Sequence, residues 1–178
     1  TDLIMDGYSS LYFDPDMVNL GGSFTTGRNT YALSAQWERW SDFSSSIMRL
    51  SFESFSYVQY LMPMGYHDTV SIHTGFEHKS GDSAFRVGLE YRPTPVPDAN
   101  ADLNLLDSDK AVASLGYGKN YSNISFLEGV KLKLDGVLQV QYLMPKTITK
   151  SGAGFIGAPG YKIGGMVYGY GVTATAEF

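Results

Sequence analysis

Apolar and polar residues alternate with a period of two along most of the chain, which predicts β-strands rather than helices. The last segment shows this best, because its even positions are mostly large and apolar from Met166 to Phe178 and its odd positions are mainly Gly, Thr or Glu. Successive side chains of a strand point to opposite faces, so this segment has one apolar face and one small or polar face. No stretch has a sustained helical stripe.

The same alternation predicts eight membrane-length strands. Strands of about ten residues cross the hydrocarbon of a bilayer when they are tilted. Residues 46–60 also alternate, but a ninth crossing would place the two ends of the chain on opposite sides. We therefore expect a β-excursion outside the membrane there. The eight expected strands are residues 2–13, 17–27, 30–40, 68–79, 84–92, 110–120, 131–143 and 161–178.

The connections between the expected strands alternate in length. All seven prolines fall at segment ends or between segments, as expected if strand interiors donate ladder hydrogen bonds. Outer-membrane barrels have short periplasmic turns and long extracellular loops. We therefore expect one barrel domain over residues 1–178 with both ends in the periplasm. Periplasmic turns are expected at 26–29 and 79–82, and long extracellular loops at 41–67, 93–109 and 144–160.

Composition separates a membrane barrel from a soluble β-sandwich. The chain has 20 glycines, 14% aromatic residues and only 17% charged residues. Its polar face is often Gly, Ser or Thr, and Tyr, Phe and Met bracket the apolar face near strand ends, as a barrel in lipid requires. The terminal Phe178 matches the last residue of many bacterial outer-membrane barrels. We therefore predict an all-β, antiparallel transmembrane β-barrel in the bacterial outer membrane, with a soluble sandwich as the alternative.

Several chemistries are disfavoured by the residues present. The chain has no cysteine, which excludes a disulfide framework and thiol catalysis, and its net charge of −5 argues against nucleic-acid binding. His73 and His78 are five residues apart on one strand and so face opposite sides, which argues against a shared metal site. His67, Asp68 and Ser71 form no catalytic triad by their spacing. We expect no enzyme activity, no metal and no cofactor.

Residues 43–64 contain too many apolar side chains for a solvated loop. They are expected to form an extracellular groove for a hydrophobic ligand, in which flexible methionines adapt to varied shapes. Continuation of the strands with an aromatic girdle, or packing against a neighbouring subunit, stays open as an alternative. The candidate groove residues are Phe43, Met48, Phe52, Phe55, Tyr60, Leu61, Met62 and Met64.

A second candidate set is polar and is expected to face the barrel interior. Charges in a confined interior must be paired or hydrated. Because the signs are mixed, neighbouring strands could form a network of ion pairs, and a polar conduit is the alternative. The candidate residues are Glu38, Glu77, Arg86, Glu90, Arg92, Lys133 and Asp135.

Several motifs resemble the outer-membrane long-chain fatty-acid transporter family of the FadL/TodX type. Residues 31–43 resemble its strand that ends in a Trp-x-x-Trp-Ser-x-Phe segment, and residues 86–98 give the most specific match, continuing into Leu-Asp-Ser-Asp-Lys at 106–110. The matches keep the family's order and correspond to the C-terminal half of a member. The family's barrel has fourteen strands and an N-terminal hatch with an Asn-Pro-Ala-type motif, and no hatch is visible here.

The resemblance implies passive uptake of hydrophobic small molecules such as long-chain fatty acids, with no energy source. The expected partners are the lipid bilayer with its outer-leaflet lipid and a hydrophobic small molecule. A non-transporting scaffold subunit is the alternative, because side chains fill the interior of an eight-stranded barrel. Whether the chain is a complete small barrel or part of a fourteen-stranded one stays open, as does a second barrel chain or a homo-oligomer.

Overall fold

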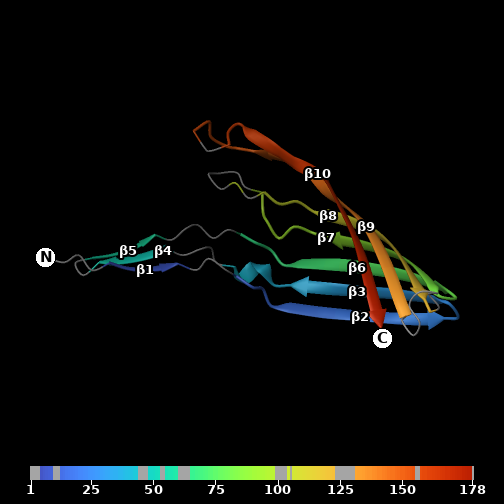
Figure 1. Cartoon of the computed structure of the whole chain (residues 1–178). Helices are drawn as coiled ribbons and strands as arrows, with labels where there is room; N and C mark the ends of the chain where they lie inside the picture. The colour runs from blue at the N-terminus through green and yellow to red at the C-terminus, as the bar shows by residue number, and fades with distance from the viewer. Residues whose placement is uncertain are drawn as a thin grey trace.

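The chain forms ten strands and one short 3₁₀ helix in the part that the computed structural model describes (Figure 1). The described residues are 5–9, 13–43, 48–52, 55–59, 65–98, 104, 106–122, 131–154 and 157–177. The elements are β1 (Met5–Ser9), β2 (Met17–Thr26), β3 (Asn29–Glu38), η1 (Trp40–Asp42), β4 (Met48–Phe52), β5 (Phe55–Gln59), β6 (Thr69–Ser80), β7 (Ser83–Arg92), β8 (Lys110–Tyr121), β9 (Lys131–Thr149) and β10 (Gly160–Glu177). Among these residues no helix is long and apolar enough to span a bilayer.

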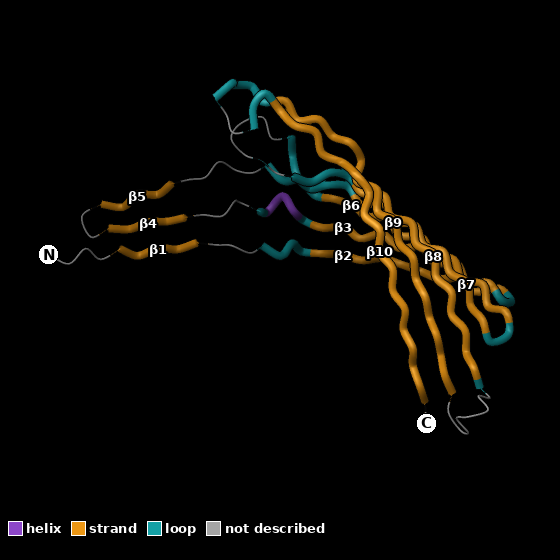
Figure 2. Tube along the Cα trace, turned by 45° about the horizontal axis from the view of Figure 1, so that its top comes forward, coloured by secondary structure: helices purple, strands orange, loops and turns teal. Residues whose placement is uncertain are grey.

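Seven strands form one antiparallel sheet in the order β10-β9-β8-β7-β6-β3-β2. Figure 2 shows this sheet as a curved, open wall with β2 and β10 at its two edges. The seven strands correspond to seven of the eight expected ones. The all-β antiparallel architecture predicted from the alternation is therefore confirmed, and the sheet is the wall of a partial barrel. Because seven is an odd number, β2 starts and β10 ends at opposite ends of the sheet, so the expectation that both ends of the chain lie in the periplasm is wrong.

The remaining three strands form a separate sheet in the order β1-β4-β5, which lies beyond the ends of β2, β3 and β6 (Figures 1 and 2). Residues 46–60 contribute the β4–β5 hairpin to this sheet and add no strand to the seven-stranded one. Residues 2–13, expected as the first membrane strand, contribute β1, which pairs with β4 rather than with β2.

The strands of the sheet are joined at one end by two tight turns and by residues 122–130, and at the other end by long connections. We call these two ends the turn end and the loop end. At the turn end, Gly27 and Gly81 take positive φ angles of 57° and 58°, which glycine adopts without strain. The backbone N–H of Lys79 donates to the carbonyl of Arg28 at 2.8 Å and so joins the two turns. The connections of the loop end are residues 39–68, 93–109 and 150–159.

The two faces of the sheet differ as the alternation requires. Leu138 lies opposite Leu115 on one side and Tyr170 on the other, so the register aligns apolar side chains from strand to strand into one apolar face. Tyr170 is 88% exposed and Leu138 is 59% exposed. A sandwich would bury both against a second sheet, whereas lipid covers such a face in a membrane barrel. The only buried hydrophobic side chains among the described residues are Val96 and Ile148, both outside the middle of the sheet.

β9 is longer than the alternation predicts, and the outer parts of β9 and β10 are paired across a bulge. β9 continues through Pro145 to Thr149, although residues 144–160 were expected to form a loop and every proline was expected outside strand interiors. The register shifts between Ile163 and Gly165, so that Met144 and Pro145 of β9 lie opposite the single residue Gly164 of β10. Gly164 has a φ of 144°, and a Cβ there would approach Pro145 Cα to 3.0 Å. The bulge therefore accommodates a proline, which cannot donate to the ladder.

Candidate functional site on the polar face

The polar face of the sheet carries all seven residues that the sequence suggested for the barrel interior. The strand register places Glu77 opposite Arg86 and His73 opposite Glu90, and His73 Nδ1 lies 3.6 Å from Glu90 Oε2. The same parity places the others on this face, away from the exposed apolar side chains. Six of the seven form two groups, four of them in a cluster at the turn end and Glu38 with Arg92 at the loop end, while Glu90 pairs with His73.

The turn-end cluster is a chain of alternating charges across β6, β7, β8 and β9. Arg86 is at its centre, with Nε 2.7 Å from Glu77 Oε2 and Nη1 3.0 Å from Asp135 Oδ1. Lys79 Nζ lies 3.2 Å from Glu77, and Lys133 Nζ lies 3.2 Å from Asp135. Each carboxylate therefore has two cationic partners, which is how charges on a confined polar face are compensated.

Two glycines of β8 provide the space for this cluster. Gly116 lies directly opposite Arg86, and a Cβ there would contact Arg86 Cβ at 3.4 Å. Gly118 is opposite Asp135, and a Cβ there would overlap the Asp135 carboxylate and approach Arg86 Nη1 to 3.2 Å. The absence of side chains at Gly116 and Gly118 therefore lets Arg86 lie across β8 and reach Asp135 on β9.

A hollow of about 560 Å³ lies on the polar face beside this cluster. Its floor is made of small residues, including Ala32, Gly75, Gly88 and Gly171 from four strands. Gly75 lies opposite Ala32 on β3 and Gly88 on β7, so the small residues are aligned across the sheet. The hollow therefore has an uncharged floor with the charged side chains of the cluster at one side.

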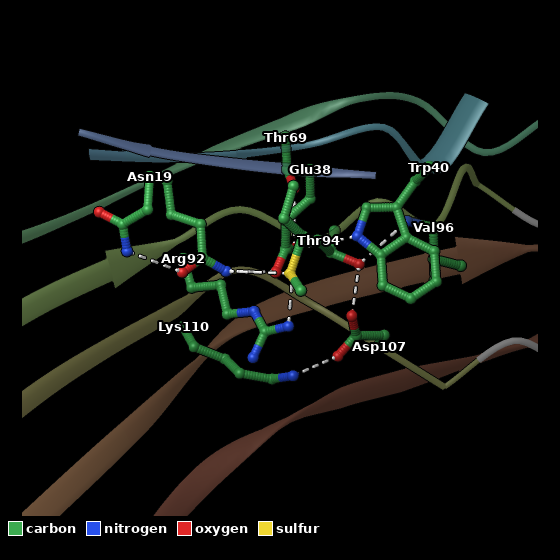
Figure 3. A network of polar contacts seen from close by, with 11 residues as sticks. Asn19, Glu38, Trp40, Thr69, Arg92, Thr94, Val96, Asp107 and Lys110 are labelled. Carbon is green, nitrogen blue, oxygen red and sulfur yellow. Dashed lines mark hydrogen bonds and ion pairs between the residues drawn. The ribbon is translucent and has the colours of Figure 1, made fainter. Parts of the chain in front are cut away.

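The loop end has a buried carboxylate at its centre, that of Glu38, which is 4% exposed (Figure 3). Gln36 Nε2 donates to it at 2.8 Å, Trp40 Nε1 at 3.0 Å and Thr69 Oγ1 at 3.4 Å. Arg92 Nη2 lies 3.7 Å from the same carboxylate. Because these partners come from β3, η1, β6 and β7, Glu38 connects the ends of three strands to the first turn of a long connection.

The connection after β7 is held against the sheet by two aspartates. Asp107 accepts from Thr94 Oγ1 at 2.7 Å and pairs with Lys110 Nζ at 2.8 Å (Figure 3). Asp109 accepts from the backbone N–H of Thr94 at 2.9 Å and from the Tyr91 hydroxyl at 2.8 Å. Burial opposes ionisation of Asp107, but the hydrogen bonds from Lys110 and Thr94 outweigh it and hold the pKa of Asp107 below its usual value.

Four aromatic rings form a cluster beside Glu38. The ring centroids of Phe43 and Tyr66 are 5.0 Å apart, and those of Phe13 and Phe43 are 5.1 Å apart. Trp40 lies 6.0 Å from Phe13 and 6.1 Å from Tyr66. Burial, followed by the nearby Asp107 carboxylate, raises the pKa of the Tyr66 hydroxyl. The loop end therefore presents an apolar cluster next to a hydrogen-bonded carboxylate.

Of the eight candidate groove residues, Phe43 is the one whose side chain is described. It belongs to this aromatic cluster. The others lie outside the part of the chain whose side chains are described, so their prediction stays a prediction. They are Met48, Phe52 and Phe55, which lie in β4 and β5, and Tyr60, Leu61, Met62 and Met64.

The sequence interpretation missed partners that lie far apart in the chain. Thr69 and Thr94 carry no signal of their own, because their role depends on which carboxylate the fold brings to them. Trp40 and Asp107 lie within the two segments that resemble the transporter family, at 31–43 and 106–110, which was the available signal. No group of three possible metal ligands occurs among the described residues, and His78 is bonded to Asn29 at 2.7 Å on the opposite face from His73.

The family model of the outer membrane protein transport proteins (OMPP1/FadL/TodX) matches residues 5–154 of the chain. The chain belongs to this family. This membership confirms the resemblance that the motifs of the chain indicated. It also confirms the predicted location of the chain in the bacterial outer membrane. A member of the FadL/TodX family lies in a lipid bilayer, which explains why the apolar face of the seven-stranded sheet is bare. No curated protein sequence matches the chain.

A solved structure is similar in fold. The crystal structure of a Pseudomonas aeruginosa FadL homologue superposes with a TM-score of 0.60 and is 22% identical in sequence. The match covers 91% of this chain and 35% of that one. The FadL/TodX chain described here therefore spans about a third of the length of the homologue, consistent with a partial barrel.

Proposed function

We propose that this chain forms part of the wall of an outer-membrane barrel that passes hydrophobic small molecules, such as long-chain fatty acids, without an energy source. The loop end faces the outside of the cell and the turn end faces the periplasm, as in other outer-membrane barrels. The apolar residues of 43–64 capture the ligand at the loop end. The observation that carries this proposal is the hollow on the polar face.

The hollow supports transport because it keeps the interior of the barrel open. Long side chains fill the interior of narrow barrels, whereas Ala32, Gly75, Gly88 and Gly171 leave space next to the sheet. Its volume of about 560 Å³ lies within the range of small-molecule sites, roughly 300–1,000 Å³. A neutral floor of this kind suits an alkyl chain, which makes no directional contacts.

The two edges of the sheet indicate that other strands complete the wall. Within the described residues no strand pairs with the outer edge of β2 or of β10. An unpaired backbone polar group in hydrocarbon costs several kcal/mol, so an open edge does not persist in a membrane. The match to about a third of a longer family structure supports completion by further strands, either of the same protein or of a second chain.

A scaffold without transport is the second candidate function, and the turn-end cluster favours it. Arg86 is bonded to both Glu77 and Asp135, so the charges span four strands of the polar face. Such a cluster stabilises a wall and narrows its interior. Under this alternative the hollow is a gap above the sheet that no ligand crosses.

Uptake of a fluorescent long-chain fatty acid by intact cells that express the protein tests the proposal. Gly75→Leu fills the hollow, since a Cβ at Gly75 is 3.6 Å from Ala32 Cβ and is tolerated. Gly22→Leu is the matched control, because Gly22 lies on the apolar face with nothing within 4 Å of its Cβ position. If the protein transports fatty acids, uptake should be slower with Gly75→Leu than with the parent protein and unchanged with Gly22→Leu. Equal uptake by both variants and the parent protein, with unchanged heat-modifiable mobility, would favour the scaffold.

A further inference from the structure

A groove of about 580 Å³ runs along the apolar face over β8, β9 and β10, near the turn end. Its floor is at Gly136, which lies between Tyr117 on β8 and Val172 on β10 in the register of the sheet. No heavy atom lies closer than 4.0 Å to a Cβ built at Gly136. The missing side chain therefore leaves a gap between two rows of large apolar residues.

The groove has the shape of an extended alkyl chain. Along β8 its lining extends from Leu115 to Tyr121, a distance of about 20 Å at 3.4 Å per residue. Barrel strands are tilted by about 40° from the membrane normal, so about 20 Å along β8 corresponds to about 15 Å of depth. This depth matches the hydrocarbon of one leaflet, which is about 15 Å thick. Leu134, Leu138 and Tyr170 line the rest of it.

A single cation, Lys119, lies at the turn end of this groove. Lys119 is opposite Leu134, on the apolar face, and its Nζ is 5.1 Å from the centroid of the Tyr121 ring. The other charged residue of the lining, Asp135, has its carboxylate on the polar face, bonded to Arg86. A lysine on a lipid-facing surface extends its ammonium to the interface, where it meets headgroups. Tyrosine favours the same depth.

We infer that this groove binds one molecule of an anionic phospholipid of the periplasmic leaflet. One acyl chain lies over Gly136, and the headgroup phosphate accepts a charge-assisted hydrogen bond from Lys119. Tyr117 and Tyr121 flank the glycerol region. The site is on the outside of the wall and is separate from the hollow on the polar face. It rests on the proposed orientation, with the turn end in the periplasm, but not on whether the barrel transports anything.

Native mass spectrometry of the protein in mild detergent tests this site, with phosphatidylglycerol and phosphatidylcholine of identical acyl chains as the probes. The parent protein is expected to retain one molecule of phosphatidylglycerol in preference to phosphatidylcholine. Lys119→Gln lowers that retention roughly tenfold, to the level of phosphatidylcholine, and Lys119→Arg keeps it. Gly136→Leu fills the groove and removes retention of both lipids, whereas Gly22→Leu, on the same face at β2, retains them as the parent does.

Three results would overturn the inference. They are equal retention by Gly136→Leu and Gly22→Leu, no effect of Lys119→Gln, and preferential retention of lipid A over phosphatidylglycerol. Heat-modifiable mobility on a gel verifies that each variant is folded. If Gly136→Leu does not fold, Val172→Trp narrows the same groove from β10, where Val172 is 81% exposed, and must lower retention as well.

Discussion

Arg86 Nη1 lies 3.0 Å from Asp135 Oδ1, although a whole strand, β8, separates the two residues. Neighbouring strands are about 4.8 Å apart, so the two residues are separated by about 10 Å across β8, and a side chain on the intervening strand would block a direct ion pair. The pair forms because Arg86 lies over Gly116 and beside Gly118, where no side chain intervenes. Glycines of the polar face therefore determine which charges meet, as much as the charges themselves do.

Replacement of Arg86 by methionine is expected to destabilise the sheet. Glu77 and Asp135 would lose their shared partner, and only Lys79 and Lys133 would compensate them. Because these side chains are partly exposed, we expect a loss of about 1–2 kcal/mol in the free energy of unfolding. The urea midpoint of the detergent-solubilised protein measures it.

Lys79→Met is the control for Arg86→Met. Lys79 contacts one carboxylate and is 66% exposed, so its loss should cost less than about 1 kcal/mol. Equal midpoints for the two variants would show that the bridge from β7 to β9 contributes nothing beyond an ordinary surface pair.

Gly118→Val is expected to separate Arg86 from Asp135 without removing either charge. The new side chain would occupy the space of the Asp135 carboxylate, which must move. We expect a loss of about 1–3 kcal/mol, the usual cost of overpacking, in the same unfolding measurement. Gly22→Val, with nothing near its Cβ position, should leave the midpoint unchanged. In the double variant Gly118→Val with Arg86→Met the two losses should not add, because both remove the same contact.

The strands and faces of this protein could be predicted from the sequence because they depend on local alternation. Seven expected spans match the seven strands of the sheet, and Glu77, Arg86 and Asp135 lie on one face because the side-chain period of a strand is two. The alternation also identified 46–60 as β-structure, but it did not show that this segment adds no strand to the sheet, which was inferred from the number of crossings.

The partners of these elements could not be predicted in the same way. Residues 2–13 alternate well enough for a strand, but alternation does not reveal that β1 pairs with β4. Pro145 reads as a strand end, and only the bulge in β9 at Met144 and Pro145, opposite Gly164 of β10, permits β9 to continue through it. Likewise the link between Thr94 and Asp107 depends on the path of a connection with no periodicity.

Replacement of Glu38 by leucine is expected to disrupt the loop end. Trp40 Nε1, Thr69 Oγ1 and Arg92 would lose the buried carboxylate, and an unsatisfied buried polar group costs about 1–3 kcal/mol. The emission of Trp40 reports the change, because its indole N–H loses a charged acceptor. The measurement uses a Trp37→Phe background, so that Trp40 is the one remaining tryptophan.

Glu38→Gln is the control for Glu38→Leu. Its amide oxygen still accepts from Trp40, so its emission maximum should lie closer to that of the parent than the maximum of Glu38→Leu does. Unchanged emission of Glu38→Leu would contradict the assigned bond between Trp40 and Glu38.

The attachment of residues 93–98 to the sheet is expected to weaken in acid. Because the pKa of Asp107 is lowered in the folded protein, its ionised form contributes stability above its ordinary pKa near 3.8, and this stability is lost as the pH falls through the lower folded value. Protonation weakens the contacts of Asp107 with Lys110 and Thr94. The free energy of the local opening that exposes this segment to exchange therefore falls by about 1 kcal/mol. Hydrogen exchange of the Thr94 and Val96 amides, corrected for the intrinsic effect of pH, should accelerate roughly fivefold below the folded pKa of Asp107.

Asp107→Asn is the control. Its Thr94 and Val96 amides should exchange faster already at neutral pH, and their exchange should no longer respond to acid. An unaltered acid response in that variant would assign the effect to another carboxylate.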